Sequence, residues 1–244
     1  MTGSTEGSAP MGRRRFVRAG LTGTVMMAVG LASGHAATST TPRADEKGPR
    51  PRTPESALQE LTAGNARWRT FHERNPDRTR VVRQTLVAGQ HPFAAVLGCV
   101  DSRVPPELVF DQGLGDLLTV RSAGSVLDEA ILASITYGVL ELGIPLVVVL
   151  GHQSCGAVTA AVQAVQDGQT LPGHMQYLAE QIRPAIDPTL QGLARLDAAI
   201  TANVRLVRSR LAAEPDLAPR VMAGGLAVVG ARYELTSQRV HRIH

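Results

Sequence analysis

Continuous runs of apolar residues alternate along this chain with longer segments in which apolar residues recur every three or four positions. A strand that is buried on both faces is apolar throughout, whereas a helix at the edge of a core is apolar on one side only. The pattern therefore predicts buried strands at 92–97, 117–121, 145–150 and 227–233.

Helices are predicted between these runs, and several of their ends carry capping signals. Thr53 as N-cap, Pro54 at the first helical position and the acid Glu55 predict a helix from here to about residue 68. Gly143 is placed to end another helix. The further predicted elements are helices at 78–88, 127–142, 156–165 and 174–210, the last broken near two prolines, a helical turn at 105–110, and a turn at 235–239 before a short tail.

This alternation predicts an α/β fold, with a mostly parallel sheet and helices on both faces. There is no internal repeat and no sign of a second domain, and 244 residues suffice for one large domain. In such sheets ligands bind beyond the carboxyl ends of the strands, so residues that follow the strands are the first candidates for function.

Net charge changes this picture little. The formal charge is +4, and the first twenty residues account for +3 of it, with Arg13, Arg14, Arg15 and Arg18 against Glu6. The rest of the chain is near neutral and has no basic patch with interleaved aromatic residues, so we expect no nucleic-acid partner.

Residues 1–37 are predicted to be a signal peptide of the twin-arginine type. The arginines precede a weakly apolar run at 19–33, and small residues follow it. The run is too short and too rich in Gly, Thr and Ala for a stable membrane span. We therefore expect an exported, extracytoplasmic protein with a flexible linker at 38–52 and one domain at 53–244. Met11 is an alternative start, and a leader that does not function would leave the protein cytoplasmic.

The chain has two cysteines, and each follows a predicted strand. Cys99 comes after 92–97, and His152 and Cys155 come after 145–150. Thiolate and imidazole are ligands that zinc prefers, and a site with only three strong ligands keeps a fourth position open for catalysis. The alternatives that the residues leave open are cysteines acting as small buried hydrophobes, a disulfide, and a Cys–His nucleophile pair.

Asp101 and Arg103 stand beside the first cysteine. They are two positions apart in an extended segment, so their side chains can share one side. They form either an exposed ion pair of little consequence, or an orienting pair in which Arg103 keeps Asp101 ionised next to the metal.

The sequence Cys-Val-Asp-Ser-Arg at 99–103, together with His-Gln-Ser-Cys at 152–155, resembles the paired motifs of the β-class carbonic anhydrases. The resemblance covers the domain at 53–244. Further similar segments lie at 64–67, 104–107, 111–116, 120–124, 147–152 and 230–233.

The resemblance implies that Cys99, His152 and Cys155 bind Zn²⁺ and that Asp101 and Arg103 form the catalytic pair. It implies reversible hydration of CO2 to bicarbonate and a proton by zinc-bound hydroxide, with Asp101–Arg103 as an orienting and gating dyad. It also implies a C-terminal edge strand, an N-terminal helical arm lying over a partner, and a homodimer or a dimer of dimers.

Three positions refine this expectation. Gln90 matches a glutamine that some family members place in the substrate pocket. Val96 stands where some members have Trp, so we expect no inhibitory bicarbonate pocket. Ser122 stands where Asn is usual, which leaves open whether Asp101 moves onto the zinc. We hypothesise that Asp101 also binds zinc in a closed, inactive state, because it is close enough to compete with water.

Other functions share these motifs. Related proteins of the same fold hydrolyse carbon disulfide or carbonyl sulfide. A non-catalytic zinc module with Asp101 as a permanent fourth ligand, and a thiol redox protein with a Cys99–Cys155 disulfide, are the remaining alternatives.

Overall fold

The computed structural model describes residues 49–244. The predicted signal peptide, 1–37, and most of the predicted linker, 38–52, lie outside these residues and stay predictions. Among the helices of this part of the chain, none has both the length and the hydropathy that a membrane crossing requires.

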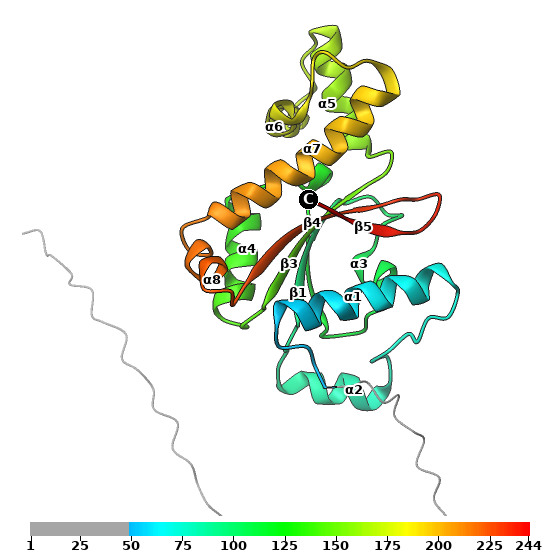
Figure 1. The fold of residues 1–244 in the computed structure, drawn as a ribbon, viewed down its shortest axis with the longest axis vertical. Helices are drawn as coiled ribbons and strands as arrows, with labels where there is room; N and C mark the ends of the chain where they lie inside the picture. Colours follow the sequence, from blue (N-terminus) through cyan, green and yellow to red (C-terminus); the bar gives the residue numbers. More distant parts are fainter. Residues whose placement is uncertain (1–48) are drawn as a thin grey trace, which may run out of the picture. The chain divides into compact units, whose positions relative to one another are not determined.

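The described residues form a five-stranded sheet in the order β2-β1-β3-β4-β5, with helices around it (Figure 1). Neighbouring strands from β2 to β4 are parallel, and β5 is antiparallel to β4. The predicted α/β fold is confirmed, including the edge strand that the resemblance implies, whereas the short tail expected from the apolar pattern is wrong. The strands are β1 (Ala94–Gly98), β2 (Leu117–Arg121), β3 (Leu146–His152), β4 (Ala227–Tyr233) and β5 (Val240–Ile243).

The helices lie close to their predicted positions, except α8, which the pattern missed. The long helical region breaks at its prolines, as predicted. The helices are α1 (Pro54–Arg69), α2 (Arg80–Thr85), α3 (Pro106–Val109), α4 (Glu129–Leu140), α5 (Gly156–Asp167), α6 (Met175–Ile182), α7 (Gly192–Ala213) and α8 (Ala218–Met222), with 3-10 helices η1 (Leu86–Ala88), η2 (Ala123–Ser125) and η3 (Arg183–Ala185).

Both faces of the sheet are covered because its central strands are apolar throughout. Every residue of β1 and β3 is buried. Alternate side chains point to opposite faces: Leu97 and Val149 pack with residues of α4 and α7, and Val96 and Val148 pack with residues of α1 and α3. Figure 1 shows α1 on one side of the sheet and α4 and α7 on the other.

The N-terminal arm packs on its own chain. Thr53 caps α1 in a reciprocal pair with Ser56, which confirms the predicted start. Leu61 is buried, and a Cβ on Gly64 would lie 1.8 Å from the Phe110 carbonyl oxygen, so only glycine permits this close approach. Whether the arm also lies over a partner stays a prediction.

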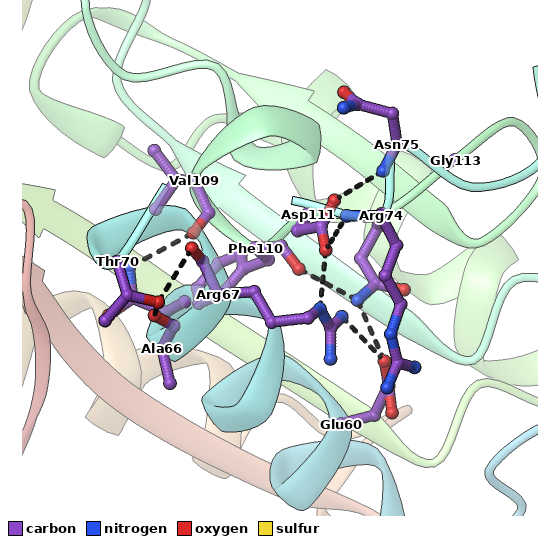
Figure 2. A network of polar contacts seen from close by, with 12 residues as sticks. Glu60, Ala66, Arg67, Thr70, Arg74, Asn75, Val109, Phe110, Asp111 and Gly113 are labelled. Atoms are coloured by element: carbon purple, nitrogen blue, oxygen red, sulfur yellow. Dashed lines mark hydrogen bonds and ion pairs between the residues drawn. The ribbon is translucent and has the colours of Figure 1, made fainter. Parts of the chain in front are cut away.

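A polar network fixes the end of α1 to the turn after α3 (Figure 2). The Asp111 carboxylate accepts hydrogen bonds from Arg67 Nε at 2.5 Å and from the backbone N–H groups of Arg74 and Asn75, each at 3.0 Å. Arg67 also contacts Glu60 at 3.2 Å. The Asp111 side chain is only 2 % exposed, so this carboxylate is almost fully removed from water.

The end of the predicted linker is held in place. Arg50 donates to the carbonyl oxygens of His91 and, at 3.2 Å, of Gly115, and its guanidinium lies 3.6 Å from the buried Asp116 carboxylate. The predicted linker therefore makes contacts with the domain at Arg50, and its flexibility stays a prediction.

Candidate metal centre

Cys99, His152 and Cys155 meet at the carboxyl end of the sheet. Their ligand atoms all lie within 4.8 Å of one another, and all three residues are buried. Cys99 follows β1, His152 is the last residue of β3, and Cys155 is the N-cap of α5. The parallel neighbours β1 and β3 bring their ends together, as predicted. His152 is in a strand rather than in a loop because β3 continues its pairing with β4 up to this residue.

The two cysteine sulfurs are unbonded and 3.9 Å apart. A disulfide requires about 2.05 Å. Two thiolates on one tetrahedral zinc, with Zn–S distances of about 2.3 Å, would be about 3.8 Å apart. The separation therefore fits a shared metal and not a disulfide.

The contact between the two thiols shifts their pKa values in opposite directions. The hydrogen bond from Cys155 lowers the pKa of Cys99 to about 4, and the same bond raises the pKa of Cys155. The pair thus gives up its first proton readily and holds the second. Thiolate is the form that binds metals, so the contact between the two thiols favours one of them as a ligand before the other.

The imidazole of His152 is oriented as a ligand. Its Nδ1 lies 2.9 Å from the Gln153 carbonyl oxygen, and because a carbonyl can only accept, Nδ1 carries the hydrogen. The lone pair is then on Nε2, which is buried and has no hydrogen-bond partner among residues 49–244. A buried polar atom without a partner is rare, and a metal ion would satisfy it.

Asp101 and Arg103 form the predicted pair. Arg103 Nε and Nη2 contact the two carboxylate oxygens at 2.9 and 2.7 Å, and the backbone N–H of Arg103 donates at 3.0 Å. These bonds hold the pKa of Asp101 well below its usual range. Asp101 Oδ2 lies 3.9 Å from His152 Nε2, so an ionised carboxylate borders the three ligand atoms.

Arg121 supports the Cys99–Asp101 turn, and the sequence reasoning assigned it no role. From the end of β2, its Nε donates to the Cys99 carbonyl at 2.8 Å and its Nη2 to the Asp101 carbonyl at 2.7 Å. Both acceptors are backbone atoms, so no side-chain motif signals the contact.

Gly124 was also missed. Its N–H donates to Cys99 Sγ at 3.4 Å, and its φ of +66° is one that L side chains rarely adopt. A Cβ here would also lie 2.9 Å from Ile182 Cδ1. The one available signal was a glycine inside a tight loop after a strand.

Gln90 lies before β1 and the cluster lies beyond it. It is exposed and precedes β1, whereas Cys99 follows β1. An extended chain of that length spans about 30 Å. The predicted contact of Gln90 with substrate therefore stays a prediction of the resemblance.

Comparisons with known proteins place this geometry in context. The family model described as "Carbonic anhydrase" matches residues 94–240. "Carbonic anhydrase 2" of Mycobacterium tuberculosis is 41 % identical over 188 residues, 76 % of this chain and 91 % of the relative. "Carbonic anhydrase" of Mycolicibacterium smegmatis is 40 % identical over 189 residues, 77 % of this chain and 92 % of the relative. The solved β-carbonic anhydrase CcaA shares the fold with a TM-score of 0.62 at 26 % identity, over 76 % of this chain and 94 % of that structure.

Proposed function

Because the chain belongs to the β class of the carbonic anhydrase family, we propose that it interconverts CO2 and bicarbonate at a zinc ion held by Cys99, His152 and Cys155. The cluster of three buried ligand atoms within 4.8 Å of one another carries this proposal. A zinc ion bound there would supply a Lewis acid that lowers the pKa of water towards neutrality. The donor set of two sulfurs and one imidazole suits zinc.

Asp101 would act as the orienting group. Three N–H groups of Arg103 donate to the Asp101 carboxylate. Each carboxylate oxygen can accept more than one hydrogen bond, so acceptor capacity is left over. Asp101 Oδ2, 3.9 Å from His152 Nε2, can therefore accept a further hydrogen bond from a group bound next to that nitrogen. Because its pKa is held low by Arg103, the carboxylate stays an acceptor throughout the neutral range.

The surroundings of the two sulfurs suit an uncharged substrate. Cys99 and Cys155 pack in an apolar cluster with Val126, Val158 and Ile182. Such a cluster excludes water from one side of the site, and an apolar molecule such as CO2 enters it more readily than an ion does. Arg103, whose side chain is 55 % exposed, places a positive charge beside the site that would favour the departing anion.

We also propose that Asp101 joins the ligands in a closed state at low pH. Its proximity to His152 Nε2 supports this, and its pairing with Arg103 opposes it. Structures of the zinc-loaded protein across a pH series test the idea. An intact Asp101–Arg103 pair at every pH would contradict it.

Stopped-flow CO2 hydration of the zinc-loaded protein, from about pH 6 to 9, tests the main proposal. Asp101→Ala should reduce kcat by at least about a hundredfold while zinc stays bound. Asp187→Ala is the matched control, because Asp187 likewise accepts from a backbone N–H two residues on but lies in the segment between α6 and α7. Absence of hydration in a zinc-loaded wild type would reject the function, and hydrolysis of carbon disulfide or carbonyl sulfide instead would assign that alternative.

We further propose a homodimer or a dimer of dimers. The β-carbonic anhydrases of Sordaria macrospora are described as tetrameric. In the described part of this chain Val81 and Val87, on and after α2, are 71 % and 86 % exposed, and Leu114 is 49 % exposed. Light scattering should give a mass above that of one chain, and a monomer at micromolar concentration would contradict the proposal.

We propose export by the twin-arginine route as the role of residues 1–37. The arginines at 13–15 and the weakly apolar run behind them support it. Replacing Arg13 and Arg14 by lysine should retain the protein in the cytoplasm. Unchanged export would count against this route.

A further inference from the structure

Asn203 is a buried amide in the middle of α7, with 3 % of its surface exposed. Its Nδ2 donates to the carbonyl oxygen of Gly124 at 2.8 Å. Its Oδ1 accepts no hydrogen bond from any residue of the described part of the chain. Burying an amide oxygen without a hydrogen-bond partner is unfavourable. The bond to Gly124 is therefore what favours asparagine at this position over an apolar residue of the same size.

The loop that receives this bond also touches the metal centre. The Gly124 N–H donates to Cys99 Sγ at 3.4 Å. Gly124 and the next residue, Ser125, have φ values of +66° and +55°. A left-handed conformation at a residue other than glycine is unfavourable, so this loop needs support from its surroundings to persist. Asn203 supplies that support from a separate element.

The helix that carries Asn203 is fixed against the strand that carries His152. The next residue of α7, Val204, packs so closely on Gly151 that a Cβ there would lie 2.4 Å from Val204 Cγ2. Gly151 directly precedes His152 in β3. One helix therefore sets the position of the Gly124 donor relative to the strand that presents the imidazole.

We propose that Asn203 is a positioning residue of the metal centre, which holds the Gly124 N–H on the sulfur of Cys99. The inference rests on the proposed zinc site. A hydrogen bond to a thiolate takes up part of its negative charge and fixes the direction of its lone pairs. Metal affinity and the electronic properties of the sulfur–metal bond should then depend on an amide that touches neither.

Cobalt(II) in place of zinc gives two readouts besides activity, namely affinity against a chelator and the energy of the sulfur-to-cobalt charge-transfer absorption. Asn203→Leu keeps the volume and removes the donor. We expect it to lower cobalt affinity about tenfold and to shift the absorption. Val207→Ala is the control: it lies on the same helix, is 2 % exposed, and packs in a different apolar cluster from the one that contains the sulfurs. It should lower thermal stability and leave both cobalt readouts unchanged.

The outcomes separate this inference from the proposed function. A folded Asn203→Leu protein with wild-type affinity and absorption overturns the role of Asn203 and leaves the metal site intact. A wild-type protein that binds no cobalt rejects the metal site and this inference together. Should Asn203→Leu not fold, Asn203→Ala relieves any steric conflict, and the same two readouts decide. Equal changes in Val207→Ala would show a loss of general stability and would also overturn the role.

Discussion

The Arg67–Asp111 pair permits a stability prediction whose size follows from the structure. We consider Asp111→Asn, because Asp111 has a φ of +47° and asparagine tolerates that conformation as aspartate does. The change therefore removes a charge and not a backbone conformation. Asp111 is 2 % exposed on its side chain and Arg67 is 15 % exposed, so the pair is largely desolvated.

Removing one partner of a buried ion pair costs about 3–5 kcal/mol. Arg67 keeps its contact with Glu60 at 3.2 Å, so the guanidinium is not left without a counter-charge. Arg74 and Asn75, whose N–H groups also lose the carboxylate, are exposed and can turn to water. We therefore expect a cost at the lower end, about 3 kcal/mol of the free energy of unfolding.

The same carboxylate gives a pH dependence. Burial alone would raise the pKa of Asp111, but hydrogen bonds from Arg67, Arg74 and Asn75 outweigh it and lower the pKa. A carboxyl whose folded pKa is below its unfolded value of about 3.9 stabilises fully above that value. The contribution is lost as the pH falls through the folded pKa. The difference between wild type and Asp111→Asn should be constant near neutral pH and shrink below about pH 4.

Urea unfolding followed by circular dichroism, at fixed protein concentration and at several pH values, measures both effects. Asp187→Asn is the control, because it removes a fully exposed carboxylate whose pKa is also lowered, by Thr189. Its urea midpoint should stay at the wild-type value. A cost for Asp111→Asn below about 1 kcal/mol, or one that persists unchanged at pH 3, would refute the reasoning.

Three further predictions concern the metal and the backbone. Gly124→Ala should lower stability by about 1–3 kcal/mol, because of the left-handed φ and the contact with Ile182, and should weaken cobalt binding; an unchanged melting temperature would show that the loop adapts. Removing zinc with a chelator should lower the melting temperature, since a ligand at a thousand times its Kd contributes about 4 kcal/mol; identical melting of apo and zinc-loaded protein would mean that no tight site forms. Thr53→Ala should lower the free energy of unfolding by about 1 kcal/mol, because α1 loses its N-cap. A larger loss in Ser56→Ala than in Thr53→Ala would show that Thr53 is not the main capping residue.

The apolar pattern predicted the parallel strands because burial on both faces requires continuous apolar runs. The predicted limits of β2 and β4 agree with the structure. The pattern missed β5, whose residues His241 and Arg242 are exposed, because that strand depends on pairing with β4 and not on its own composition. It missed α8 for a similar reason, since a helix of five residues has too few positions to show a period.

The three residues of the candidate metal centre could be found from sequence because their chemistry is in their side chains and the sheet topology brings strand ends together. Arg121, Gly124 and Asn203 could not, because they act through backbone carbonyl and N–H groups that every residue has. Only the tertiary fold shows which backbone groups they meet.

If residues 1–37 are removed as the proposed signal peptide, the contacts of Arg50 set a limit on where the chain can be cut. Arg50 joins the turn before β1 to the carboxylate of Asp116, which is completely buried. A protease that removes the leader and leaves Arg50 in place preserves this arrangement, wherever it cuts upstream. A cut after Arg50 would remove the cation beside that carboxylate, together with its contacts to the carbonyl oxygens of His91 and Gly115. The first residue of every mature form should therefore be residue 50 or an earlier one, even if the leader peptidase itself has little sequence preference.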